Sequence, residues 1–301
     1  MSVKTLPPVT PVRTTPRWRV TVAAVLGGAL LAASATLVRL AETLPATAAT
    51  FRFVYALPVL AALAVSERRR HGPYPAQART MAWAAGALLA VDLILLHHVI
   101  GYVGAGLATV LGNLQVFVLA LAAWWFLKER PAPRLLAATP IAFGGVVLLS
   151  GAFDTNAYGA RPLLGVALGA LTSITYAAFL LVYRHGTAST GHLFTPLAHA
   201  TAAAAPVAII AGTLTGGVDL VPTWPNHAWL VILALSAQVA GWLLVGYALP
   251  RQPVVLTALL LLFQPVAALL LAAITLEERP SPTQLVGCTL ITAALTYARR
   301  P

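Results

Sequence analysis

Charged side chains occur inside two long apolar stretches of this 301-residue sequence. Asp92 is the one acidic residue well inside such a stretch, and Arg52 lies near the start of another. In apolar surroundings a charged group is costly unless it has a function or a partner. Asp92 could therefore bind a proton or the amine of a ligand, or it could form a structural ion pair with Arg52. The residues alone leave both interpretations open.

Four amide side chains form a second group of candidate binding residues. Asn113, Gln115, Gln238 and Gln264 each fall near the middle of an apolar stretch. An amide both donates and accepts hydrogen bonds, so it can hold a neutral or zwitterionic molecule; its alternative role is to join packed helices. Asn113 and Gln115 are two residues apart, which is about 200° around a helix. We therefore expect only Gln115 of these two to face a ligand.

Two aromatic residues complete the candidate set. Tyr176 and Trp242 could line a cavity for an apolar or aromatic molecule, or they could pack in the core and against lipid. The sequence contains no Walker motif, no HExxH and no nucleophile elbow, and its single cysteine, Cys288, offers no metal cluster. We expect no catalytic residue, no metal and no cofactor.

The stretches that must position these residues have the composition of membrane-spanning helices. Hydrophobic residues make up 59% of the chain, charged residues 9%, and the mean hydropathy is +0.84. The net charge of +11 sits in short clusters between apolar runs, a pattern that argues against a nucleic-acid partner. Ten apolar runs approach the length that crosses a bilayer: 20–39, 46–65, 80–99, 103–127, 133–151, 163–183, 194–214, 227–249, 253–275 and 283–298.

The first run also has features of a signal peptide, because basic residues precede it and Ala33-Ser34-Ala35 could be cleaved. Its removal would leave nine spans and disrupt the repeat described next. We therefore expect it to be retained as a helix.

A short motif shows that the chain is internally duplicated. LKERPAP at 127–133 recurs as LEERPSP at 276–282, and the same shift places Gln115 on Gln264. Because each unit has five spans, an odd number, the second unit must enter the bilayer from the opposite side. The sequence thus predicts an all-α polytopic membrane protein with ten transmembrane helices arranged as two inverted five-helix repeats.

Loop charges predict the orientation of this duplicated chain. Most Lys and Arg residues fall in loops on the side of the N-terminus, which the positive-inside rule assigns to the cytoplasm. Both termini are then cytoplasmic. The predicted parts are a cytoplasmic N-terminal tail at 1–19, a first five-helix repeat at 20–151 and a second at 152–301.

Several motifs together resemble the EamA-type family of the drug/metabolite transporter superfamily. They are Thr50-Phe51-Arg52-Phe53, the Glu-Arg-Pro ends at Glu129 and Glu278, Gln264-Pro265, and the glycines Gly144-Gly145 and Gly287. The resemblance implies ten helices, a central cavity, and export or uptake of small metabolites such as amino acids or drug-like compounds. Val116 stands where the second half has Pro265, so a proline-kinked helix is expected in the second half only.

These observations predict a secondary transporter that moves an amino-acid-like or drug-like metabolite across the cytoplasmic membrane by alternating access, in the direction of export. Inverted repeats suit this mechanism because two halves can rock about a central site. A passive channel or facilitator is the alternative. The expected partners are the small-molecule substrate, the lipid bilayer, protons as a coupling ion, and a second copy of the chain in a homodimer.

Overall fold

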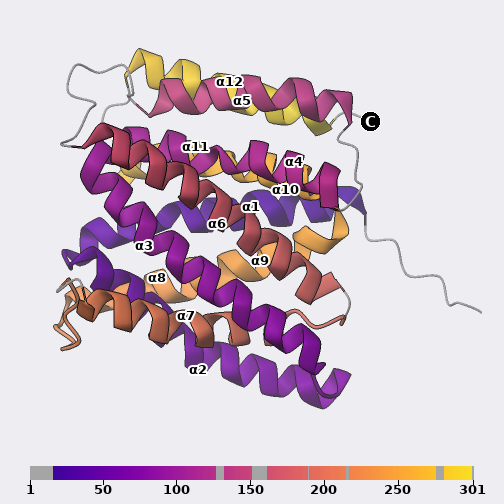
Figure 1. Cartoon of the computed structure of the whole chain (residues 1–301), viewed down its shortest axis with the longest axis vertical. Helices are drawn as coiled ribbons and strands as arrows, with labels where there is room; N and C mark the ends of the chain where they lie inside the picture. Colours follow the sequence, from indigo (N-terminus) through magenta and orange to yellow (C-terminus); the bar gives the residue numbers. More distant parts are fainter. Residues whose placement is uncertain are drawn as a thin grey trace, which may run out of the picture.

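The computed structural model describes residues 16–126, 132–150, 161–188, 190–214, 217–275 and 281–299, and these residues form helices and connecting loops without strands. Figure 1 shows the helices running roughly alongside one another. Their bounds are α1 Arg17–Ala41, α2 Pro45–His71, α3 Ala76–Asn113, α4 Gln115–Phe126, α5 Pro133–Leu149, α6 Pro162–Ala188, α7 Phe194–Leu214, α8 Asn226–Leu233, the π-helix η1 Ala234–Gly241, α9 Trp242–Ala248, the 3₁₀-helix η2 Leu249–Arg251, α10 Val254–Leu261, α11 Phe263–Thr275 and α12 Pro282–Arg299.

Eight of the ten expected spans are long and apolar enough to cross a membrane within the described residues. The two remaining spans correspond to α5, a shorter apolar helix, and α12. The qualifying segments are Arg17–Ala41, Ala46–His71, Ala76–Val103, Leu107–Trp125, Leu163–Ala188, Phe194–Leu214, Asn226–Arg251 and Val254–Thr275.

Local sequence signals explain the two ends of α2. The helix begins with Pro45, whose fixed φ and missing N–H suit the first helical position. It ends with a basic last turn, Arg68 to His71, which complements the negative end of the helix dipole. Gly72 then takes φ 80°, a left-handed conformation that favours glycine and stops the helix.

A buried carboxylate fixes α2 to the start of α7. Glu67 is 4% exposed and accepts hydrogen bonds from the backbone N–H groups of Leu193, Phe194 and Thr195, at 2.6 Å and 2.7 Å for the first and last. The Thr195 hydroxyl donates a further bond at 2.7 Å. An anion at a helix N-terminus satisfies amides that have no partner within the helix. Glu67 therefore holds the end of α2 against the start of α7. The sequence analysis had placed Glu67 beyond the end of the span at 46–65.

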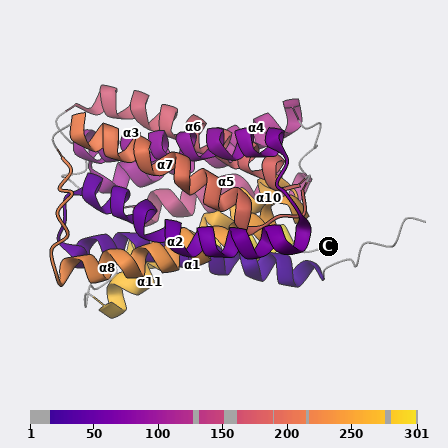
Figure 2. The ribbon, with the colours of Figure 1, turned by 90° about the horizontal axis from the view of Figure 1, so that it is seen from below.

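The helices pair reciprocally between the two halves of the chain. The packing of α3 on α6 has its counterpart in the packing of α1 on α8, η1 and α9, while α2 pairs with α7, α4 with α10, and α5 with α12. In Figures 1 and 2, α3 and α6 run beside each other, and Figure 1 shows α5 and α12 together at one edge of the bundle. Exchange of the two halves thus regenerates these helix pairings.

Glycines allow the backbones to approach closely at these crossings. A Cβ on Gly145 would lie 2.7 Å from the carbonyl oxygen of Gly287, and a Cβ on Gly287 would lie 2.6 Å from that of Gly145. Gly27 of α1 meets the backbone of Gly241 in the same way. Lipid provides no hydrophobic force between helices, so association depends on such close packing.

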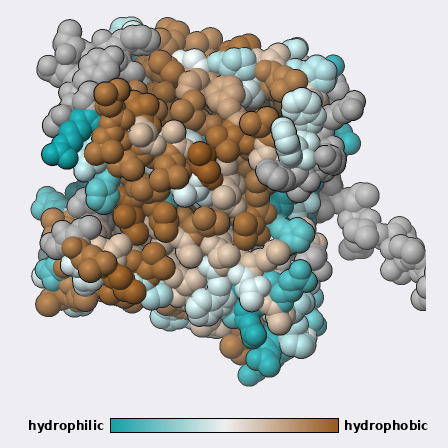
Figure 3. Space-filling model, viewed as in Figure 1, coloured by the Kyte–Doolittle hydropathy of each residue, from teal (hydrophilic) through white to brown (hydrophobic). Residues whose placement is uncertain are grey.

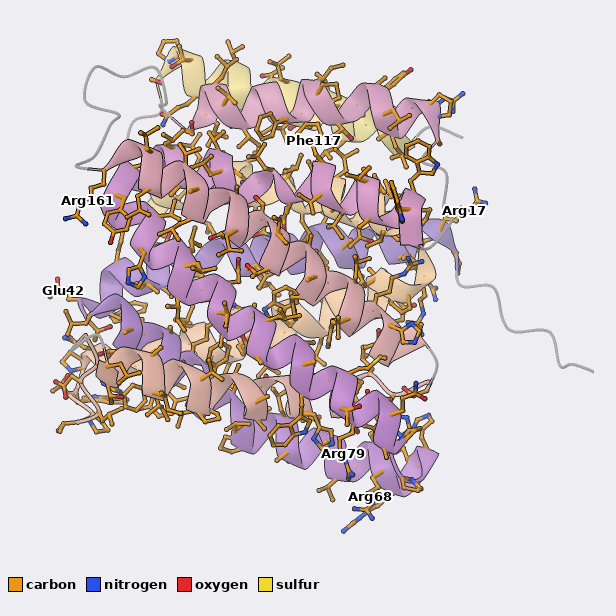
Figure 4. All side chains as sticks on the ribbon, viewed as in Figure 1. Arg17, Glu42, Arg68, Arg79, Phe117 and Arg161 are labelled. Atoms are coloured by element: carbon orange, nitrogen blue, oxygen red, sulfur yellow. The ribbon has the colours of Figure 1, made fainter. Side chains whose placement is uncertain are left out.

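The outer surface is apolar between two charged ends. Figure 3 shows hydrophobic residues over the middle of the visible face, with hydrophilic residues gathered toward its edges. Trp125, Leu163 and Leu214 are 68%, 88% and 82% exposed. Figure 4 places Arg17, Arg68 and Arg79 at one end of the bundle, and Glu42 and Arg161 at the other. A surface of this kind fits lipid, and the chain is a multi-pass membrane protein.

Two helix boundaries differ from those expected. A break was expected between 99 and 103, but α3 continues through these residues and ends at Asn113. The expected span at 227–249 is interrupted by the π-helix η1. The repeated Glu-Arg-Pro segments, with Glu129 and Glu278, lie outside the described residues.

Candidate functional site

A cavity of about 490 Å³ lies between the two halves of the chain. Side chains from α1, α2, α3, α4, α6, α8, α9 and α11 line it, and most of them are apolar. Seven of the eight residues singled out from the sequence are in this lining: Arg52, Asp92, Asn113, Gln115, Tyr176, Trp242 and Gln264.

Both duplicated glutamines follow a break in a helix. Leu114 N–H bonds to the carbonyl of Leu111 at 3.1 Å, and Leu262 N–H bonds to that of Leu259 at 3.0 Å, so each turn tightens to a three-residue spacing. Gln115 begins α4 directly after the first break, and Gln264 is the second residue of α11. Irregular backbone at membrane depth is tolerated where it lines a cavity.

The break corrects the expectation that only one of Asn113 and Gln115 can face a ligand. The 200° separation assumes one continuous helix, whereas Asn113 ends α3 and Gln115 starts α4. Both residues line the cavity as a result.

The second half has the break expected from its proline, and the first half has a break that no proline produces. Pro265 lacks the N–H that would bond to the carbonyl of Leu261, which accounts for the second break. In the first half the Asn113 side chain donates to the carbonyl of Thr109 at 2.8 Å, next to a poor helix former, Gly112. A side chain that takes a helical carbonyl competes with the backbone, so Gly112-Asn113 was the signal for the first break.

Arg52 is held by an amide of the π-helix. Its Nε donates to Oε1 of Gln238 at 3.0 Å, and Nε2 of Gln238 donates to the Thr201 hydroxyl at 3.1 Å. Gln238 and Thr201 are both 0% exposed, so Gln238 supports the cavity from behind instead of lining it. π-Helical turns inside α-helices are frequent at functional sites.

Asp92 and Arg52 share the cavity without meeting. Among the described side chains no ion pair joins them, so that alternative is not realised in this conformation. A polar neighbour of the carboxylate is the hydroxyl of Thr175 on α6. The Oδ1 atom of Asp92 is buried without a hydrogen-bond partner among the described residues.

Five buried polar atoms that belong to lining residues have no partner in the described part of the protein. Buried polar groups are nearly always hydrogen-bonded, so such a cluster is a candidate site for contacts with water or a ligand. The atoms are Asp92 Oδ1, Gln115 Oε1, Ser34 Oγ, Thr172 Oγ1 and Trp242 Nε1. The sequence analysis did not name Ser34 or Thr172 as candidate site residues. Their hydroxyl groups in the middle of apolar spans could have indicated them.

An aromatic cluster closes the cavity on the side of the C-terminal half of α6. The Phe179 ring meets Trp242 edge-on with centroids 4.8 Å apart, and Phe179 stacks on Tyr183 at 5.6 Å. Tyr176 contacts Trp242 at 6.3 Å and lies beside Gln264. Phe179, Tyr183 and Trp242 are each at most 2% exposed, so the cluster is tightly packed.

These features define a class: a multi-pass helical membrane protein in which two copies of one unit enclose a central cavity that is mostly apolar and carries a few polar side chains. A model of the EamA-like transporter family matches the chain twice, at residues 18–151 and 163–299. The chain belongs to the EamA-like transporter family, which confirms the resemblance drawn from its motifs.

Solved structures agree on the fold. One crystal structure of a protein superposes with a TM-score of 0.75 at 19% sequence identity, over 94% of this chain and 97% of the other. At that identity the likeness concerns the fold alone. No curated protein matches the chain in sequence.

Proposed function

We propose that the chain is a secondary transporter that carries a small solute through the central cavity by alternating access. The observation that supports this most directly is the set of five unpaired polar atoms around the cavity. The cavity volume, about 490 Å³, falls in the range of small-molecule sites, roughly 300 to 1,000 Å³. The solute is an amino-acid-like or drug-like metabolite, bound through Gln115, Gln264 and their neighbours.

The proposed topology is ten spans in two inverted repeats, with both termini in the cytoplasm. The reciprocal helix pairing supports it, as does the placement of Arg17, Arg68 and Arg79 at one end of the bundle and Arg161 at the other. In this arrangement α5 and α12, which pair at Gly145 and Gly287, are the two remaining spans. The membrane is the cytoplasmic membrane.

The conformation corresponds to the outward-facing half of the cycle. On α1 the cavity is lined from Leu31 to Val38, and on α2 from Ala48 to Arg52, which are the halves nearest the exterior in this topology. The aromatic cluster around Phe179 lies toward the cytoplasm and is closed. Export requires the opposite state, in which this cluster separates and the outer halves close.

Solute counterflow in proteoliposomes tests the transporter against a passive channel. Vesicles are loaded with an unlabelled compound, chosen from amino acids, nucleosides and cationic drugs by its thermal stabilisation of the protein. A carrier produces transient accumulation of external labelled compound above equilibrium, because exchange needs a binding site that faces one side at a time. Influx without an overshoot would instead identify a channel.

The substitution Gln264→Leu tests whether this residue belongs to the proposed binding site. We expect it to raise the apparent dissociation constant at least tenfold, about 1.4 kcal/mol, with little change in folding. An overshoot with unchanged affinity would remove Gln264 from the site and leave the transporter class intact.

A further inference from the structure

The guanidinium of Arg52 has one fixed nitrogen and two free ones. Nε donates to Gln238, and Arg52 makes no other hydrogen bond or ion pair within the part of the chain that the structure describes. Arg52 lines the cavity, so Nη1 and Nη2 have room for a partner there. A guanidinium carries five N–H donors in a rigid fork, and one donor is used by Gln238.

The bond to Gln238 also fixes how that fork is presented. Gln238 is fully buried, and Thr201 holds its amide from the other side. The two bonds assign the amide orientation, because Oε1 faces the Arg52 donor and Nε2 faces the Thr201 hydroxyl. The guanidinium plane is therefore set from behind, which reduces the entropy lost when a ligand binds to its open edge.

A cation at this depth in a bilayer calls for a compensating group. Charged side chains inside membrane proteins face the bundle interior or a water-filled cavity, pair with one another or with backbone carbonyls, and mark substrate pathways. Asp92 is the acidic residue of the cavity, and no ion pair joins it to Arg52 among the described side chains. Nη1 and Nη2 of Arg52 are thus available to bond with a group that enters the cavity.

We propose that Arg52, positioned by Gln238 and Thr201, is the anchor for a carboxylate group on a solute with an apolar body. This assignment rests on the proposed function. A carboxylate matches the guanidinium fork with two parallel hydrogen bonds. The Ser34 hydroxyl and the Trp242 indole N–H are unpaired donors on the same cavity, and its other walls are mostly apolar and include Tyr176.

Three probes that share a phenylpropyl skeleton and differ in the charge of the end group test the charge of the ligand. They are 3-phenylpropionate, its neutral amide 3-phenylpropionamide, and the cation 3-phenylpropylamine, titrated calorimetrically into the purified full-length protein in detergent. We expect the acid to bind at least tenfold more tightly than the amide, and the amine to bind most weakly. Failure of the acid to bind, or acid binding no tighter than the amide, would overturn the assignment.

Substitutions then locate the effect at Arg52. We expect Arg52→Gln to weaken acid binding at least tenfold and to leave amide binding unchanged, whereas Arg52→Lys retains part of the preference because it keeps the charge without the fork. Thr201→Val tests positioning, since it should weaken binding of the acid alone. Arg161→Gln removes the same charge from an exposed residue at one end of the bundle and should change neither affinity.

Equal losses for acid and amide in Arg52→Gln would show a structural role and reject the anchor. The proposed function fails separately: acid binding that depends on Arg52, without counterflow, would refute the transporter and keep the anchor. Counterflow of a solute that is indifferent to Arg52→Gln would keep the transporter and reject the anchor.

Discussion

Gln115 and Gln238 are both buried amides near the middle of the bundle, yet their surroundings are opposite. Gln115 lines the cavity and its Oε1 has no hydrogen-bond partner among the described residues, whereas Gln238 bonds to both Arg52 and Thr201. An unpaired buried amide adds little to stability, but a paired one is expensive to remove because its partners lose their bonds. We therefore expect Gln115 to serve ligand binding and Gln238 to serve helix packing.

We expect Gln115→Leu to leave the apparent melting temperature unchanged or slightly raised, and to weaken solute binding. In contrast, Gln238→Leu should lower stability by about 1 to 3 kcal/mol, because it leaves Arg52 and Thr201 without their partner. Thermal unfolding of the two variants in the same detergent checks the contrast. A larger loss of stability in Gln115→Leu than in Gln238→Leu would assign Gln115 to helix packing.

At the residue scale the sequence identified the charged and amide side chains of the cavity lining but not its serine and threonine hydroxyls. Charged and amide residues at membrane depth are rare enough to be informative, which is why Asp92 and Gln264 could be named in advance. Hydroxyls are less informative because they often bond to their own helix, as Ser236 does to the carbonyl of Ile232 at 2.6 Å. Whether Ser34 does so could be learned only from the structure.

At the scale of elements, the crossing of α5 and α12 depends on two facing glycines. A Cβ on Gly145 would approach the carbonyl oxygen of Gly287 to 2.7 Å, while a Cβ on the adjacent Gly144 would meet nothing within 4 Å. We expect Gly145→Ala to cost about 1 to 3 kcal/mol by overpacking, and Gly144→Ala to be neutral or to stabilise the helix by up to about 1 kcal/mol.

Apparent melting temperatures of these two alanine variants test the crossing. The result that contradicts this packing is an equal effect of the two substitutions, because they differ only in which face of α5 receives a methyl group.

Element boundaries were the part of the fold that sequence patterns predicted least well. Apolar runs indicate where a helix can cross a bilayer. A break in the helix inside such a run does not change the hydropathy of the run, so the pattern does not reveal it. The break at Leu114 therefore escaped a reading that looked for proline, and so did the π-helix around Gln238. The break at Leu262 was anticipated because Pro265 removes a backbone donor.

At the scale of the whole molecule, loop charge and helix packing predict an inverted arrangement. Single cysteines at Arg70 and Arg184 should react with an impermeant thiol reagent from the cytoplasmic side, and those at Arg161 and Asp219 from the outside. Vesicles of known orientation, with Cys288 replaced by alanine, provide the measurement. Reaction of all four positions from one side would contradict the odd number of spans per repeat.

Alternating access through the central cavity is tested most directly by a single cysteine in place of Ser34, which lines the cavity on α1. The variant Ser34→Cys, made with Cys288→Ala, is placed in sealed vesicles that contain glutathione, and a charged thiol reagent is added to vesicles of either orientation. We predict that the introduced thiol reacts from both sides while the trapped glutathione stays unmodified, because the cavity opens to one side at a time. Reaction from one side only, or protein-dependent loss of the trapped glutathione, would contradict alternating access.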